Sequence, residues 1–168
     1  MSSYFAKIDM YANGTPYYKP LLVPGIHYKT LAEVETLCVT AFGNNEQRRK
    51  IFNLFSDLLN KVLSLGLDWV IWINGSFVTE KTEPGDIDVL FVPADQKAVN
   101  SLEQDEKRLL MELFSDRGRT KKRYLTDAIF APEVTVDPNQ HMYWRGVFGF
   151  DREDRPRGWV QLKLGEQR

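Results

Sequence analysis

Two apolar segments flank a short polar loop near the middle of the chain, and this arrangement constrains the fold more than any other feature. "DWVIWI" at 68–73 and "DIDVLFV" at 86–92 place aliphatic and aromatic residues at consecutive positions, which is typical of strands covered on both faces. Between them lie Gly75 and Ser76, then nine residues, then Asp86 and Asp88. Because only the first positions of the second segment are polar, we expect the two aspartates at a mouth of the sheet.

The rest of the chain predicts helices before these strands and mixed structure after them. Thr30 and Glu33 form a capping-box pattern that begins a helix, and a second amphipathic helix follows "GNN" at 43–45 and ends near Gly66. Downstream, we expect a helix over 97–115, a cationic loop over 116–123, a strand within 124–132 and a hairpin over 148–162. This order predicts an α/β (α+β) domain with helices packed on a mixed β-sheet.

The length of the chain indicates a single hydrophobic core. With 168 residues, 43% of them hydrophobic, the chain can bury roughly 70% of the surface that its unfolded form exposes. Residues 1–28 are rich in tyrosine, proline and glycine, so we expect an extended N-terminal arm packed on the surface. Residues 29–168 are expected to form one domain.

Charge and composition exclude several classes of function. The net charge of -1 provides no chain-wide field for binding DNA or an anionic membrane. No apolar run approaches the ~20 residues of a membrane helix, and the N-terminus lacks the pattern of a signal peptide, so we expect a cytoplasmic protein. Cys38 is the only cysteine and lies on an apolar stripe, which predicts a buried thiol, and two histidines without ligand spacing make a zinc site improbable.

The paired carboxylates point to a divalent cation. Side chains two residues apart on a strand share a face, so Asp86 and Asp88 would repel each other unless a cation neutralised them. Ligands that are all oxygen select Mg²⁺ or Mn²⁺, which share their coordination shell with phosphates. Asp127, in "LTDAIFAP", is the best third ligand, and a salt bridge to the neighbouring cationic loop would explain its position equally well.

The Gly-Ser pair supplies groups suited to a polyphosphate. Gly75 permits close approach of the backbone, while the amides and the Ser76 hydroxyl can donate hydrogen bonds. Lys81 is a candidate phosphate contact, although a lysine in a polar loop is more often simply solvated. The cationic run over 117–123 is either a solvated segment or a contact for triphosphate or RNA.

Near the C-terminus, Arg152, Arg155 and Arg157 alternate with acidic residues and are expected to pair with them at the surface. The four tryptophans are expected in the core, and stacking of adenine on Tyr143 or Trp144 is left open.

"NGSFVTEKTEPGDIDVLF" resembles the signature of the nucleotidyltransferase superfamily typified by DNA polymerase beta. The matching residues are Gly75, Ser76, Asp86, Asp88 and Asp127, and the motif with its context covers roughly 60 residues. Longer stretches, including "PGIHYKTLAEVE" and "FGFDREDRPRGWVQL", resemble uncharacterised bacterial and phage proteins described only as nucleotidyltransferase-like.

The chain is also similar to the minimal nucleotidyltransferases of toxin–antitoxin systems, and it lacks the added helical domain of antibiotic-modifying relatives. The resemblance implies a nucleotidyltransferase-like fold.

The resemblance implies a nucleotide- and ATP-binding transferase that moves NMP from an NTP to a protein or RNA hydroxyl with Mg²⁺ or Mn²⁺, in a toxin–antitoxin or phage-defence setting. Asp86, Asp88 and Asp127 would be catalytic and metal-binding, and Gly75, Ser76 and Lys81 would bind nucleotide. Two alternatives remain. One is a catalytically silent antitoxin-like module that regulates a partner protein, and the other is an RNA-binding protein that uses the cationic run.

Overall fold

A five-stranded mixed sheet forms the centre of the molecule in the computed structural model, which describes residues 10–165. The strands are β1 (Gly25–Tyr28), β2 (Trp69–Asn74), β3 (Ile87–Pro93), β4 (Thr126–Phe130) and β5 (Gly158–Leu164). Their order is β1-β5-β2-β3-β4, with parallel pairs at both edges and antiparallel pairs between them. The α+β class expected from the sequence is confirmed.

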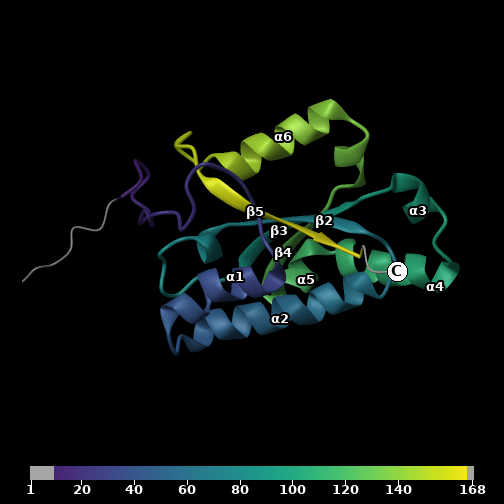
Figure 1. Cartoon of the computed structure of the whole chain (residues 1–168), viewed down its shortest axis with the longest axis horizontal. Coiled ribbons are helices and arrows are strands. Elements are labelled where there is room, and N and C mark those ends of the chain that lie inside the picture. Colours follow the sequence, from purple (N-terminus) through teal and green to yellow (C-terminus); the bar gives the residue numbers. More distant parts are fainter. Residues whose placement is uncertain (1–9, 166–168) are drawn as a thin grey trace, which may run out of the picture.

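Helices cover both faces of this sheet (Figure 1). α1 (Leu31–Cys38) and the long α2 (Glu46–Leu63) lie on one face, and α6 (Pro138–Gly149) lies on the other. The remaining helices are α3 (Gln96–Asn100), α4 (Gln104–Phe114) and α5 (Arg117–Tyr124), together with 3₁₀ turns η1 (Thr40–Phe42), η2 (Ser76–Val78) and η3 (Pro132–Thr135). α5 precedes β4 directly and packs against β4 and α2.

Alternation along the strands divides the core in two. Ile71, Ile73, Val89 and Phe91 belong to the large cluster shared with α1 and α2. The intervening residues Trp72, Leu90 and Val92 belong to a smaller cluster with Phe148 of α6. Both faces of β2 and β3 are therefore covered, as their consecutive apolar residues predict.

The N-terminal signals of the first two helices behave as the sequence predicts. The Thr30 amide donates to Glu33 Oε2 at 2.7 Å and the Glu33 amide donates to Thr30 Oγ1 at 3.2 Å, which completes the capping box of α1. Asn45 caps α2 through the Arg48 amide. α2 ends at Leu63, a little before the left-handed Gly66.

The expected cationic loop over 116–123 is wrong, because these residues form α5. Asp116 accepts a hydrogen bond from the Arg119 amide at 2.9 Å and caps the helix. The buried Thr120 hydroxyl donates to the carbonyl of Leu113 at 2.6 Å and ties α5 to α4. Lysine and arginine are good helix formers, so a cap and one tether are enough to order this polar segment.

The C-terminal hairpin is formed only in part, through an antiparallel bridge between Phe150 and Pro156, and the single helix over 97–115 is wrong. Residues 148–149 end α6, which begins at Pro138 with Asp137 as its cap, so the first arm of the expected hairpin is helical. A turn closed by the Asp151 amide on the Arg155 carbonyl at 2.9 Å then leads into β5. The segment over 97–115 divides into α3 and α4 around residues 101–103.

Residues 10–24 of the predicted arm form no helix or strand of their own and cross the domain surface, as expected. The Leu21 amide donates to the Val78 carbonyl at 3.0 Å, and the Glu80 amide donates to the Lys19 carbonyl at 2.9 Å. The predicted boundary at residue 28 is wrong, because residues 25–28 are strand β1. Residues 1–9 lie outside the described part. None of the helices within residues 10–165 has the length and apolar character needed to cross a membrane.

Candidate active site

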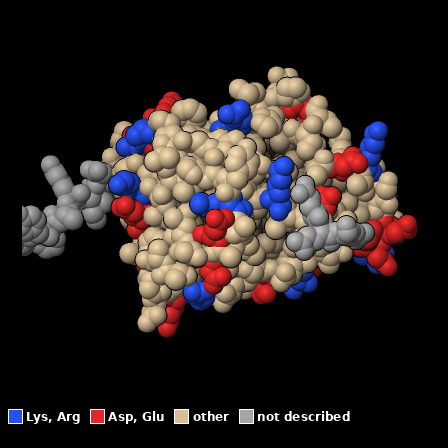
Figure 2. All heavy atoms as spheres, viewed as in Figure 1, with Lys and Arg blue, Asp and Glu red and all other residues tan. Residues whose placement is uncertain are grey.

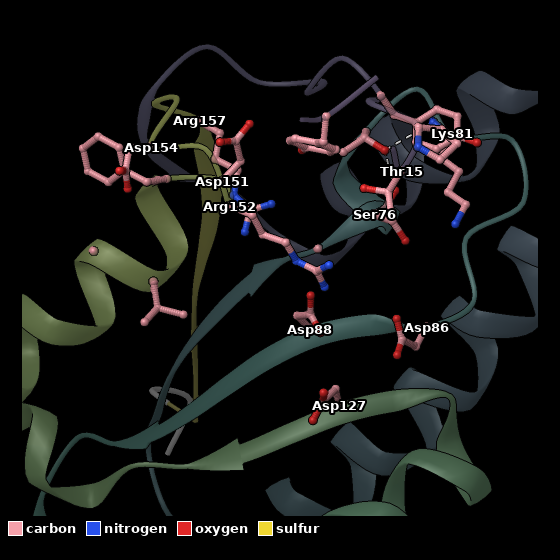
Figure 3. A pocket seen from close by; sticks show the side chains of 18 of the residues that line it. Thr15, Ser76, Lys81, Asp86, Asp88, Asp127, Asp151, Arg152, Asp154 and Arg157 are labelled. Carbon is pink, nitrogen blue, oxygen red and sulfur yellow. Dashed lines mark hydrogen bonds between the residues drawn. The ribbon is translucent and has the colours of Figure 1, made fainter. Parts of the chain in front are cut away.

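The three candidate carboxylates come together at one end of β3 and β4. β3 and β4 are parallel, and their register places Asp88 directly beside Asp127. Asp86 precedes β3 and lies two residues before Asp88, so its side chain reaches the same region (Figure 3). Local spacing in the sequence predicted only that Asp86 and Asp88 lie together. The register between β3 and β4 adds Asp127 to this pair.

The Gly-Ser turn lies directly against this group. Gly75 follows β2 with φ of +86°, and a Cβ atom there would lie 2.2 Å from Asp88 Oδ2. Both the backbone conformation and the close contact therefore require glycine. Asn74, the register partner of Asp88, is buried and donates from Nδ2 to the Phe148 carbonyl at 2.5 Å, which fixes the end of β2 against α6.

Two cations of α5 hold two of the carboxylates. Lys121 Nζ lies 2.5 Å from Asp86 Oδ2 and 3.6 Å from Asp127 Oδ2. Arg117 Nε donates to Asp127 Oδ1 at 2.6 Å. Because α5 is a helix, the i and i+4 positions of Arg117 and Lys121 place both side chains on one face. The salt bridge that the sequence left open for Asp127 is present.

The pKa values of Asp88 and Asp127 are shifted in opposite directions. Burial, followed by the charges of Asp86 and Asp127, raises the pKa of Asp88. The hydrogen bond from Arg117 lowers the pKa of Asp127 despite its partial burial. The hydrogen bond to Asp86 raises the pKa of Lys121. Asp88 is thus the carboxylate with the strongest physical need for a further cation.

By their chemistry, the three carboxylates suit a hard divalent cation, although their spacing does not match that of a metal site. Within residues 10–165 there is no cluster of three or more histidine, cysteine, aspartate or glutamate side chains close enough to hold a metal ion. However, the Lys121 ammonium already occupies a position between Asp86 and Asp127, which shows that positive charge is accommodated there. Three carboxylates match the oxygen ligands that Mg²⁺ and Mn²⁺ prefer, and one of them, the half-buried Asp88, has no ion pair with a described residue.

A cleft of about 1010 Å³ opens above the carboxylates, and all six candidate site residues line it. Figure 3 shows Asp86, Asp88 and Asp127 on one side of the cleft and Ser76 and Lys81 across from Asp86. Gly75 lines the cleft as well. The other walls come from the N-terminal arm, from α6 and from the turn after α6. A volume of this size is at the upper end of the range for small-molecule sites.

Arg48 was missed by sequence reasoning and fixes the segment that follows the Gly-Ser turn. Its side chain is fully buried and donates to the carbonyls of Cys38, Phe77, Thr79 and Lys81 at 2.7, 2.8, 2.7 and 2.6 Å. Burial lowers the pKa of Arg48 to about 10, which still leaves the guanidinium charged at neutral pH. Nothing in the local sequence of α2 distinguishes this arginine from its exposed neighbour Arg49.

The C-terminal arginines divide between surface and cleft. Arg155 pairs with Asp151 at 2.8 Å and with Glu153 at 3.6 Å, as expected. The expectation is wrong for Arg157, which lines the cleft and interacts with the charge of Asp88. Burial lowers the pKa of Arg157, and its Nε has no hydrogen-bond partner among the described residues.

The cationic segment offers little free charge for a nucleic-acid backbone. Arg117 and Lys121 contact carboxylates of the cleft, while Arg119 donates to the Glu112 carbonyl at 2.9 Å and Arg123 pairs with the Glu112 carboxylate at 3.7 Å. On the face seen in Figure 2, lysine and arginine are scattered among aspartate and glutamate without a large patch of one sign.

The expected cores around tryptophan and cysteine are confirmed. Trp69, Trp72 and Trp159 are buried, and Trp144 packs against the smaller cluster. Cys38 is fully buried, and burial raises the pKa of its thiol to about 12, so it is no nucleophile at neutral pH. Tyr143, in contrast, is exposed and lines the cleft.

Comparison with known proteins gives one match. The model of a family of unknown function, DUF6932, matches residues 16–163, which include strands β1 to β4, all of β5 except its last residue, all three carboxylates and part of the arm. No curated protein and no solved structure matches the chain.

Proposed function

The chain belongs to the DUF6932 family, a family of unknown function, and we propose from the geometry of its cleft that it is a metal-dependent nucleotidyltransferase. One observation supports this above the others. Asp88 is flanked by Asp127 through the strand register, by Asp86 just before the start of β3, and by Gly75 at a separation that tolerates no Cβ. Residues that resemble one signature in the sequence are thus neighbours in space.

The cleft offers separate places for the parts of a nucleoside triphosphate. The backbone at Gly75 and Ser76, the Ser76 hydroxyl and the Lys81 ammonium line one side and can donate to phosphate oxygens. Asp86, Asp88 and Asp127 would hold Mg²⁺ or Mn²⁺ beside them, and the bound cation would neutralise charge that develops on the phosphate oxygens. Arg157 adds a further positive charge on the cleft wall.

The proposed reaction transfers a nucleoside monophosphate. An acceptor hydroxyl oxygen forms a bond to the α-phosphorus, the bond from that phosphorus to the bridging oxygen of the β-phosphate breaks, and pyrophosphate leaves with the bonding electrons. Asp127 holds the acceptor hydroxyl and receives its proton. Because Arg117 Nε donates to Asp127 Oδ1 at 2.6 Å, Arg117 would have to move before that oxygen could accept the proton.

The proposed reaction therefore requires the ion pairs between α5 and the carboxylates to open. Lys121 and Arg117 are about half exposed, so their side chains can leave the carboxylates at little cost. With a divalent cation held by Asp86, Asp88 and Asp127, the side chains of Lys121 and Arg117 would be free to turn toward the phosphates. The elements of the sheet need not move.

The acceptor in this proposal is a protein or RNA hydroxyl. The cleft is open to solvent above the carboxylates, and its walls come from the same single domain as the site. A macromolecule can therefore present a hydroxyl from outside. The resemblance noted in the sequence supports a toxin–antitoxin or phage-defence setting for such an activity.

Transfer can be tested with nucleotides labelled at different phosphates. We would incubate the purified protein with each α-labelled NTP, or with the γ-labelled form, and Mg²⁺ or Mn²⁺ in an extract of its host, and separate labelled protein from labelled RNA. The proposal predicts incorporation from the α-label only. It also predicts loss in Asp88→Asn and retention in Asp105→Asn, a control on the outer surface of α4. Incorporation from the γ-label, or equal incorporation by Asp88→Asn, would contradict nucleotidyl transfer.

The α5 ion pairs also favour a second candidate, a silent module that regulates a partner protein. In that case, the contacts of Lys121 and Arg117 would be permanent and the site would stay without a cation. Capture of a specific host protein, equal for wild type and Asp88→Asn, combined with the absence of label transfer, would select this candidate.

A further inference from the structure

The wall of the cleft that α6 contributes has a chemistry that the carboxylates do not explain. Tyr143, Gly146 and Val147 line the cleft with the i, i+3, i+4 spacing of one helical stripe, and Phe150, the extended residue directly after α6, lines the cleft beside them. The three side chains are 59%, 42% and 46% exposed, so this stripe faces the open cleft, and the opposite side of α6 packs on the sheet through Trp144 and Phe148. An amphipathic helix normally exposes polar groups here.

Gly146 gives the second, independent indication. Glycine in the interior of a helix is destabilising relative to alanine. Packing within the chain does not require it, because a Cβ at Gly146 would meet no atom within 4 Å and φ is not left-handed. The missing side chain leaves open space on a wall of the cleft that Tyr143, Val147 and Phe150 also line. A flat ligand is the simplest reason to keep this space clear.

The position of the stripe identifies the ligand. The carboxylates, Lys121 and Arg157 line the same cleft as the stripe, so one ligand that fills it must present negative charge to one part and an apolar face to another. Tyr11 and Tyr18 of the N-terminal arm line the cleft as well and add aromatic surface. A nucleoside triphosphate has this combination.

We infer that the stripe of Tyr143, Gly146 and Val147, together with Phe150, is the base-binding surface for the nucleoside triphosphate, and that it holds the base by its face. This inference rests on the proposed function. The Tyr143 hydroxyl is the only side-chain group on the stripe that can form a hydrogen bond, so the edges of the base go largely unread. Stacking on an aromatic ring accepts any base, because every base has a π-face. The site therefore accepts all four NTPs, with purines bound more tightly than pyrimidines through their larger area.

The test compares a nucleotide with its phosphate part alone. Binding of α,β-methylene-ATP and of inorganic tripolyphosphate would be measured by calorimetry with Mg²⁺ present. In wild type, the nucleotide is expected to bind roughly 5- to 150-fold more tightly, the range for one base stacked on an aromatic side chain. The corresponding GTP, CTP and UTP analogues are expected within about tenfold of it.

Two variants and a matched control distinguish binding of the base by α6 from binding of the phosphates by the rest of the site. Gly146→Leu fills the open space with a better helix former, so this variant is expected to fold. Tyr143→Ala removes the aromatic ring. Both should bring nucleotide binding down to the level of tripolyphosphate and leave tripolyphosphate binding unchanged. Met142→Ala alters an equally exposed apolar residue of α6 that does not line the cleft, and it should behave as wild type.

The possible failures point to different errors. If tripolyphosphate binds and the nucleotide binds no more tightly, or if Gly146→Leu and Tyr143→Ala leave the difference intact, the base does not lie on α6 and this inference is wrong. The phosphate site would then stand, and the stripe would remain as a surface for a partner protein. If neither ligand binds to wild type with Mg²⁺, the proposed function itself fails and this inference fails with it.

Discussion

Replacing Arg48 by methionine tests how the loop after the Gly-Ser turn is held. The change keeps an unbranched side chain in the core and removes the donors to four carbonyls. Three of these hydrogen bonds, to Cys38, Phe77 and Thr79, are buried, and a buried carbonyl without a donor costs at least about 1 kcal/mol. We therefore expect Arg48→Met to lower the free energy of unfolding by about 3 kcal/mol. For a chain of this length, the melting temperature should fall by about 6–12 °C.

Urea unfolding followed by circular dichroism would measure this effect, with Arg49→Met as the matched control. Arg49 is adjacent in α2, but its side chain is 45% exposed and pairs only with Glu35, so its replacement should cost less than about 1 kcal/mol. If the two variants unfold at the same urea concentration, the guanidinium of Arg48 does not secure this loop. The assignment of Ser76 and Lys81 to a pre-formed phosphate site would then lose its structural basis.

Further predictions concern the carboxylates and their neighbours. Gly75→Ala should displace Asp88 and abolish nucleotide binding, while Gly85→Ala, in the same loop but with open space around it, should leave binding unchanged in calorimetry. Lys121→Met removes a half-exposed cation from the carboxylates and should tighten Mn²⁺ binding by roughly two- to fivefold in a paramagnetic resonance titration, whereas weaker binding would show that the ammonium organises the site. Because the pKa of Asp88 is raised in the folded state, metal-free wild type should lose stability as pH rises from about 4 through that pKa. Asp88→Asn lacks this loss. In urea unfolding with EDTA, the free energy of unfolding of Asp88→Asn relative to wild type should therefore increase with pH and then level off. A difference that does not depend on pH would refute the raised pKa of Asp88.

Local patterns identified the parts of the site that lie close together in sequence. The apolar runs around Gly75 and Asp88 predicted β2 and β3, and the alternation of a strand predicted that Asp86 and Asp88 share a face. The contact between Gly75 and Asp88 follows from pairing of those two strands. Only the choice of β4 as the parallel neighbour of β3 required information from distant residues, and that choice puts Asp127 beside Asp88.

The walls of the cleft could not be predicted for two different physical reasons. The many charged residues of 117–123 favour a loop, although Asp116 is an ordinary helix start. Only a helix places Arg117 and Lys121 on one face. The first arm of the hairpin expected at 148–162 was wrong because Phe148 and its aromatic neighbours fit a strand as well as a helix in a short window. Recognition of Asp137-Pro138 as a helix start would have corrected it.

The role of Arg48 could not be predicted for a third reason. Its role depends on carbonyls of residues 38, 77, 79 and 81, which meet only when α1, α2 and the loop after β2 pack together. The role of Arg157 also depends on tertiary structure, because Arg157 directly precedes β5 whereas its neighbour Asp88 lies on β3. No periodicity in the sequence distinguishes these arginines from the solvated ones, so tertiary structure alone reveals them.

Binding of a divalent cation is the most direct test of the account, because the proposed chemistry and the role of each carboxylate depend on it. Paramagnetic resonance of free Mn²⁺, titrated into wild-type protein with α,β-methylene-ATP present, would count the bound ions and give their affinity. We predict saturable binding of Mn²⁺ that is lost in Asp88→Asn, weakened in Asp127→Asn and unchanged in Asp105→Asn. Absence of saturable Mn²⁺ binding to wild type, or equal binding to Asp88→Asn, would contradict it.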